Sequence, residues 1–288
     1  MNCNFINNKS SNKVVVLKEA NLVKEKANEH NVFTQTAFMY RFMPGLIAVR
    51  DMIQNGDIGE VINFRIEVLH SSYLNEDRPI SWKLKKETSG GGPLLDLGIH
   101  MADLVRFIFG DVSAVKAHMD TVIKQRYGND SNANYQDVDV EDWSVVELFL
   151  PKNIYGNLTV SRVASLIEDR MTIEIFGMKG SLKFNINRPG NVRFYSHNKG
   201  ILKDLYYPIL SEYGEYISEI YPSTKTSMGW LIDAHFTSIY NFYHNLSSGE
   251  VVYSETPVFE EAVKAQAIIE ACYLSAKNNS EKTLVEHH

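Results

Sequence analysis

The chain has 288 residues, of which 44% are hydrophobic and 22% are charged, a composition typical of folded globular proteins. This composition excludes a disordered, collagen-like or coiled-coil chain. The net charge of −6, without a long basic run, excludes nucleic acids and anionic membranes as expected partners. Cys3 and Cys272 are too few for a disulfide framework and favour a reducing, cytoplasmic location. The sequence contains neither a signal peptide nor an apolar run of about 18 residues that could cross a membrane.

The first 70 residues predict an arm, two helices and a strand. Residues 1–12 are polar and Asn-rich, which is typical of a loose arm. Apolar residues at helical spacing predict a helix over 14–30. A second helix is expected to begin at Pro44 and to end near Gln54, before an Asn-Gly turn. Alternation of side chains over 60–70 predicts a half-buried strand.

The rest of the chain combines a loop, a long helix, several strands and two final helices. A loop over 71–89 leads to a glycine triplet, after which an apolar helix is predicted to run unbroken to Phe109. Residues 124–139 are polar and predict a mobile loop. A period of two predicts strands at 112–123, 141–150, 154–163, 170–177, 180–187 and 191–196. Helical patterns predict the last two helices at about 229–247 and 257–276.

These elements predict an α+β fold with one large open, mainly antiparallel sheet and helices on one face. We expect residues 35–282 to form this domain and residues 283–288 to be a tail of the kind that a purification tag leaves. The sheet face without helices must be covered or unusually polar. We therefore expect it to join two or four copies of the chain, the alternative being that its outer residues are simply solvated.

The stretch after the glycine triplet carries the most informative polar residues. Asp96, His100 and Asp103 fall on one stripe of a helix because their spacing is four and then three residues. Their neighbours are almost all apolar, which indicates a buried helix. Burying a carboxylate or an imidazole costs several kcal/mol unless the group is paired or faces a cavity. The stripe therefore predicts either a pocket or a tight internal network.

The stripe has a functional and a structural interpretation. In the functional one, His100 is a general acid–base, Asp96 sets its tautomer and favours its charged form, and Gly98 leaves room for a ligand. In the structural one, Asp103 pairs with Arg106, Asp96 caps backbone groups and His100 bonds to a neighbour. No metal is predicted, because a metal site would need a further ligand that the sequence does not indicate.

We expect Asp103 of this stripe to bind the substrate together with Tyr40, Arg41, Trp82 and His235, which lie outside it. Arg41, after Tyr40, could fix a carboxylate or a phosphate, or form an ion pair at the surface. Trp82 and Lys83 could line the same pocket as Asp96, the alternative being that Trp82 is a hydrophobic plug. His235 is expected near a helix start and could be a cap-region residue or a site residue.

Several common motifs are absent from the sequence. The first glycine is Gly45, and no G-x-G-x-x-G occurs, although a dinucleotide-binding βαβ unit needs glycines in its first turn. The triplet Gly90-Gly91-Gly92 does not have the spacing of a phosphate-binding loop. We expect it to allow a tight turn into the following helix.

Four motifs carry a family resemblance that extends from about residue 15 to residue 277. They are Tyr40-Arg41-Phe42-x-Pro44, Asn55-Gly56-x-Ile58-Gly59, Gly90-Gly91-Gly92-x-x-x-Asp96-x-Gly98-x-His100-x-x-Asp103 and Glu174-Ile175-Phe176-Gly177-x-x-Gly180. In this order they resemble the Gfo/Idh/MocA oxidoreductases, a family that includes glucose–fructose oxidoreductase and many sugar dehydrogenases.

The resemblance implies a C-terminal α+β domain whose open sheet builds dimers and tetramers. In the family it follows a Rossmann domain that binds NAD or NADP. This chain resembles the C-terminal part alone, with residues 1–34 as a remnant of the interdomain region. Asp96 and His100 match the family's orienting acid and proton acceptor. Lys9 falls near the position of the family's lysine, although the Glu-Lys-Pro motif around that lysine is absent.

We therefore expect the substrate-binding and oligomerisation half of an NAD(P)-dependent sugar or polyol dehydrogenase, with the cofactor site largely absent from this chain. The alternative is a non-catalytic module that binds a small polyol or serves only for oligomerisation.

Overall fold

A computed structural model describes residues 17–128, 134–166, 169–206, 220–221, 227–253 and 255–286. Lys9 lies outside these residues, as does the start of the helix expected over 14–30. None of the helices within the described ranges has the length and hydrophobicity that crossing a membrane requires.

The structure is built on one nine-stranded sheet with the strand order β10-β9-β8-β7-β1-β6-β5-β2-β11. Every neighbouring pair in this sheet is antiparallel except β1 and β6. Its strands are β1 (Val61–Leu69), β2 (Ala114–Asp120), β5 (Trp143–Phe149), β6 (Tyr155–Ser161), β7 (Arg170–Gly177), β8 (Gly180–Asn185), β9 (Asn191–Ser196), β10 (Ile201–Tyr206) and β11 (Thr283–Leu284). The predicted α+β class with a large, mainly antiparallel sheet is confirmed.

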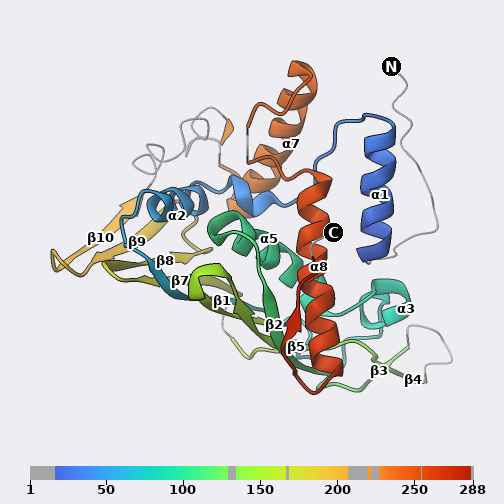
Figure 1. The fold of residues 1–288 in the computed structure, drawn as a ribbon. Helices are drawn as coiled ribbons and strands as arrows, with labels where there is room; N and C mark the ends of the chain where they lie inside the picture. The colour runs from blue at the N-terminus through green and yellow to red at the C-terminus, as the bar shows by residue number, and fades with distance from the viewer. Residues whose placement is uncertain are drawn as a thin grey trace.

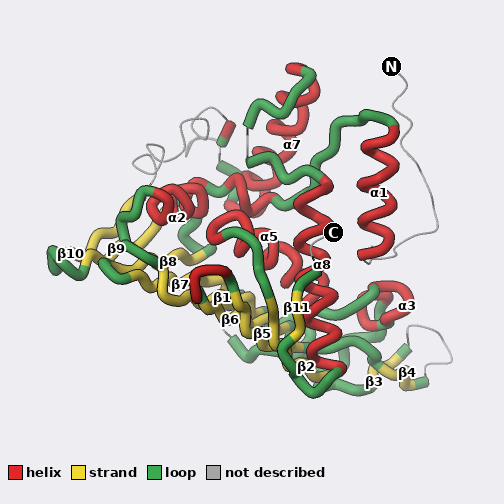
Figure 2. The backbone as a smooth tube through the Cα atoms, viewed as in Figure 1, coloured by secondary structure: helices red, strands yellow, loops and turns green. Residues whose placement is uncertain are grey.

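The main helices are α1 (Leu17–Glu29), α2 (Pro44–Gln54), α5 (Gly98–Phe109), α7 (Trp230–Ser248) and α8 (Phe259–Lys277). Shorter helical turns are η1 (Met39–Phe42), η2 (Trp82–Leu84), α3 (Lys86–Ser89), α4 (Pro93–Asp96) and η3 (Pro151–Asn153). In Figure 1, α2, α5 and α8 cover one face of the sheet, and α1 lies beside α8. Figure 2 shows the same arrangement as a layer of helices over a layer of strands.

The core lies between the helices and the sheet. The central strands point alternate side chains toward the helices, where they are buried, and toward the other face of the sheet. In β1, Phe64, Ile66 and Val68 are buried, whereas Asn63 and Arg65 are exposed on the other face. The ring of Phe64 stacks on Phe109 of α5 with centroids 4.2 Å apart. Apolar burial on one face and polar exposure on the other is the pattern of a sheet covered on one side.

The strands differ from the sequence-based predictions in three places, and one further feature was not predicted. That feature is the pairing of β1 with β6, which is parallel within a sheet expected to be mainly antiparallel. β10 was missed. The loop expected over 124–139 contains a hairpin of β3 (Gln125–Tyr127) and β4 (Tyr135–Asp137) in its described part. Residues 283–284, expected in a tail, pair as β11 with β2.

The helix predicted to run unbroken to Phe109 is in fact two helices. α4 ends at Asp96, and α5 begins at Gly98. The Leu97 amide donates to the Pro93 carbonyl and closes the first helix. A Cβ at position 98 would lie 2.9 Å from the Leu94 side chain, so glycine allows the two helices to meet closely.

Candidate functional site

The glycine triplet packs against a buried carboxylate. Glu141 is 6% exposed and accepts hydrogen bonds from the amides of Gly92 and Leu94, each at 3.0 Å. It also accepts one from the Tyr273 hydroxyl at 2.9 Å. Burial raises the pKa of Glu141, and these hydrogen bonds oppose the rise. A carboxylate at the start of a helix satisfies amides that have no partner within the helix, so Glu141 anchors α4.

This packing explains why the triplet consists of glycines. A Cβ at position 91 would lie 2.1 Å from the Tyr273 hydroxyl oxygen, and one at position 92 would lie 2.1 Å from the Glu141 carbonyl oxygen. The triplet therefore does not fit the pyrophosphate of a dinucleotide, because a carboxylate of the protein already occupies the helix start. No other adjacent glycines occur in the sequence.

Asp96, the last residue of α4, opens into a polar pocket. Its side chain is 40% exposed, and Lys83 Nζ lies 3.0 Å from its Oδ2. An Nη atom of Arg162 lies 3.7 Å from the same oxygen. The pocket has a volume of about 420 Å³ and is lined by His70, Ser72, Tyr73, Arg78, Ser81, Trp82, Lys83, Asp96, Leu97 and Arg162. The structure thus brings Asp96, Trp82 and Lys83 together.

His100 lies one turn further along, among aromatic rings. Its ring meets Phe38 and Tyr40 edge to face, with centroids 5.7 and 5.5 Å away. The residue as a whole is half-buried, but its Nδ1 is shielded from solvent and has no hydrogen-bond partner among the described residues. Tyr40 in turn stacks on Trp230 at 6.3 Å.

Burial lowers the pKa of His100 to about 4, while the charge of Asp96 raises it and that of His235 lowers it. The imidazole is therefore neutral at pH 7. His235 is exposed on the second turn of α7, and the effect of its charge on the pKa of His100 is what links it to the site. Burial also raises the pKa of Tyr40 to about 12, so its hydroxyl stays protonated.

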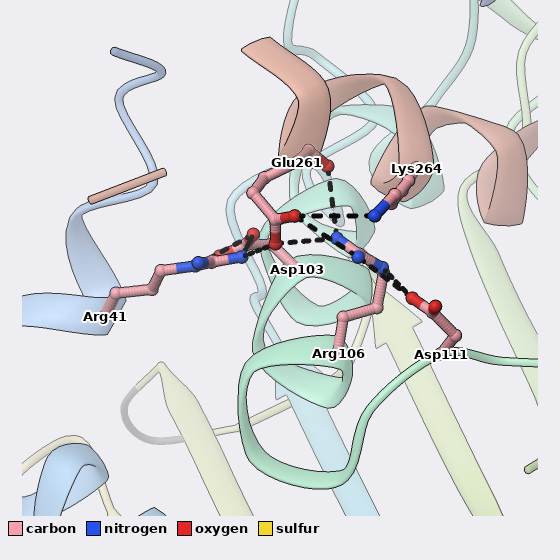
Figure 3. A network of polar contacts seen from close by, with 6 residues as sticks. All are labelled: Arg41, Asp103, Arg106, Asp111, Glu261 and Lys264. Atoms are coloured by element: carbon pink, nitrogen blue, oxygen red, sulfur yellow. Dashed lines mark hydrogen bonds and ion pairs between the residues drawn. The ribbon is translucent and has the colours of Figure 1, made fainter. Parts of the chain in front are cut away.

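Arg41 and Asp103 lie in an ion-pair network that does not open into this pocket (Figure 3). Arg41 Nε donates to the two carboxylate oxygens of Asp103 at 2.8 and 3.1 Å, and the two side chains are 4% and 1% exposed. Glu261 bridges Arg41 and Arg106, at 2.8 and 3.0 Å. Arg106 also reaches Asp111 at 2.9 Å.

Burial raises the pKa of Asp103 to about 6, although Arg41 acts in the opposite direction. The structure therefore favours the structural interpretation for Asp103, with a correction: its main partner is Arg41 and not Arg106. The alternative of a surface ion pair for Arg41 is also wrong, because the pair is buried. Substrate binding by either residue remains a prediction.

Sequence reasoning missed Glu141, Tyr273 and Arg162 as parts of the site. Glu141 and Gly92 are 49 residues apart in the sequence, and no local pattern connects them. Arg162 is 3% exposed, directly follows β6, and lies beside Asp96 because β6 ends next to α4. The signal available for Glu141 was the triplet itself, since adjacent glycines indicate a close approach by another group.

We predict that NMR titration of the His100 ring gives a pKa near 4 in the wild-type chain. Asp96→Asn should lower this pKa further, and His235→Ala should raise it. Because the folded state resists protonation, the stability that neutral His100 contributes is complete above pH 6.5 and is lost as the pH falls toward 4. A wild-type pKa at the ordinary 6.5 would contradict the burial of this ring.

Part of the chain matches a known protein family in sequence, and most of it matches individual dehydrogenases. Residues 46–183 match the family model described as the GFO/IDH/MocA C-terminal domain. Levoglucosan dehydrogenase of Pseudarthrobacter phenanthrenivorans is 26% identical over 282 residues, which cover 91% of this chain and 70% of that protein. Glucose-6-phosphate 3-dehydrogenase of Bacillus subtilis is 25% identical over 181 residues, which cover 61% of this chain and 49% of that protein.

Solved structures agree with the sequence matches. Levoglucosan dehydrogenase in complex with NADH and L-sorbose superposes with a TM-score of 0.84 at 23% identity, covering 96% of this chain and 72% of that chain. An NAD binding oxidoreductase from Klebsiella pneumoniae gives 0.84 at 22% identity, with the same two coverages. Residues 46–183 thus match in sequence the C-terminal domain of the GFO/IDH/MocA oxidoreductases, and the described chain has the fold of these enzymes.

Proposed function

We propose that the chain is the substrate-binding and oligomerisation half of an NAD(P)-dependent sugar or polyol dehydrogenase. The observation that carries the proposal is that an open Asp96 and a neutral His100, whose Nδ1 has no hydrogen-bond partner among the described residues, lie one turn apart at the junction of α4 and α5. The names of the similar proteins support a sugar substrate, and one of their structures contains NADH together with L-sorbose.

These residues suit the proton transfer that accompanies oxidation of a sugar hydroxyl. A neutral imidazole can accept the hydroxyl proton, and the negative charge of Asp96 stabilises the imidazolium that results. Trp82, 45% exposed at the pocket, offers an aromatic face to a sugar ring. Tyr40 and His235 border His100 and would complete the substrate site.

The dinucleotide would bind outside the described residues, because the glycine triplet is filled by Glu141 and Tyr273. We assign NAD or NADP to a Rossmann domain that would act together with this one. Lys9, outside the described residues, is proposed as the lysine of the catalytic set. Arg41 and Asp103 act indirectly in this proposal, since their ion pair joins η1, which carries Tyr40, to α5, which carries His100.

We predict that His100→Ala lowers the turnover of sugar oxidation by about 10²–10⁴-fold when a dinucleotide-binding domain and NAD or NADP are supplied. The reason is that the variant removes the proton acceptor. The readout is NAD(P)H absorbance under saturating sugar. His197→Ala, an exposed histidine in the turn after β9, is the matched control and should keep the wild-type rate.

Equal rates for His100→Ala and the control would remove His100 from catalysis. Sugar binding without any turnover, in the presence of cofactor and its domain, would favour the alternative of a non-catalytic binding module.

We further propose that the open sheet face joins two or four copies of the chain. Across the register of the strands, Phe149 faces Tyr155, Asn63 separates Tyr155 from Phe176, and Tyr195 follows beyond Ser181. The next row contains charges of both signs and comprises Lys116, Glu147, Asn157, Arg65, Glu174, Lys183, Arg193 and Asp204. An aromatic row beside a row that carries both charges is suited to a self-complementary contact.

We predict that light scattering after size exclusion gives a dimer or tetramer for the wild-type chain. Tyr155→Lys should shift it to a monomer, because Tyr155 is 51% exposed in the middle of the aromatic row. Met178→Lys, at a turn and 65% exposed, is the control that should leave the mass unchanged. A wild-type chain that remains monomeric at high concentration would contradict this assignment.

A further inference from the structure

The pocket beside Asp96 carries more positive than negative charge. Arg78, Lys83 and Arg162 line it, and Asp96 is the one carboxylate among the lining residues. His70 also lines it and pairs through Nδ1 with Asp169 at 2.7 Å. Asp96 is shared between Lys83 at 3.0 Å and Arg162 at 3.7 Å, so one negative charge faces two cations.

Arg78 and Arg162 both pack against the ring of Tyr73. Their guanidinium carbons lie 3.9 and 4.9 Å from the centroid of Tyr73. Arg78 also donates to the Ser72 carbonyl at 2.7 Å, and within the described ranges it forms no ion pair. With Lys83, the two arginines place three cations around the one carboxylate of Asp96, and an anionic ligand would balance this excess of positive charge.

A third arginine holds the loop that contains Tyr73 and Arg78. Arg126 of β3 is fully buried and donates to the carbonyls of Tyr73, Asn75 and Arg78. It therefore holds the loop that carries Arg78 in place, so that the cationic wall is built into the fold. The Ser81 hydroxyl at the pocket is shielded from solvent and has no hydrogen-bond partner among the described residues.

We propose that this pocket binds an anionic substituent of the substrate, which makes the substrate a sugar or polyol with a phosphate ester or a carboxylate. Guanidinium and ammonium groups form charge-assisted hydrogen bonds to the oxygens of either group. The proposal rests on the function proposed above, because it assumes that the molecule in the pocket is the one that reaches His100. The excess of positive charge in the pocket is observed independently of any catalytic role of His100.

Calorimetric titration of the chain at fixed ionic strength tests this inference. The probes are inorganic phosphate, glucose 6-phosphate, glucuronate and glucose. Saturable phosphate binding is expected, and glucose 6-phosphate or glucuronate should bind at least tenfold more tightly than glucose. The better of these two identifies the substituent as phosphate or carboxylate. Absence of phosphate binding, or equal affinity for all three sugars, would overturn the proposal.

Two variants should change phosphate affinity in opposite directions. Arg78→Gln should weaken it at least fivefold, whereas Asp96→Asn should strengthen it at least threefold, because Asp96 competes for the same cations. Arg188→Gln, which removes an exposed charge in the turn after β8, is the control and should change affinity less than twofold. If Arg78→Gln does not fold, Asp96→Asn decides the matter, and weaker binding in that variant would contradict the proposal.

The proposed function fails separately from this inference. With a dinucleotide-binding domain and NAD or NADP supplied, His100→Ala should lower turnover by about 10²–10⁴-fold and leave phosphate affinity intact. Under the same conditions, phosphate binding without any turnover would refute the dehydrogenase proposal alone, and turnover of glucose without an anionic preference would refute this inference alone.

Discussion

The buried carboxylate of Glu141 is the constraint on which the site depends. It accepts hydrogen bonds from two amides at the start of α4 and from the Tyr273 hydroxyl of α8. One contact thus ties the β4–β5 loop and α8 to the short helix whose last residue is Asp96. Removing a partner from such a cluster leaves buried donors unsatisfied, at a cost of about 1–3 kcal/mol each. Gly91 and Gly92 are needed because a Cβ at these positions would clash with the Tyr273 hydroxyl and with Glu141, respectively.

Asp96 and Asp103 lie in consecutive helices but have opposite environments. Asp96 is 40% exposed and opens into a cationic pocket, whereas Asp103 is 1% exposed and held by Arg41. Removing one partner of such a buried pair costs about 3–5 kcal/mol, because the other charge remains buried. Asp96 ends α4, whereas Asp103 lies within α5, on the other side of the break at Leu97. Asp103 thus joins α5 to η1 through Arg41, whereas Asp96 is left open at the pocket.

Most helices and strands could be predicted from local sequence patterns. Which strands pair, and which side chains meet across the fold, could not. Pro44 and the Asn-Gly turn marked α2, and alternation marked β1. The parallel pairing of β1 with β6 depends on chain topology, which a period of two does not encode. The break after Asp96 was missed because every residue there is compatible with a helix. Arg41 meets Asp103 and Glu261 across 62 and 220 residues, and the spacing of one segment carries no information on contacts of that range.

Native-state hydrogen exchange of Glu141→Gln tests most directly whether this carboxylate anchors the site. Glutamine keeps the size but replaces one acceptor oxygen with a donor, so that at least one α4 amide loses its partner. The account predicts that the amides of Gly92, Leu94 and Leu97 exchange at least tenfold faster, while those of β7 and β8 keep their wild-type rates. Unchanged rates in α4, or an equal increase throughout the sheet, would contradict it.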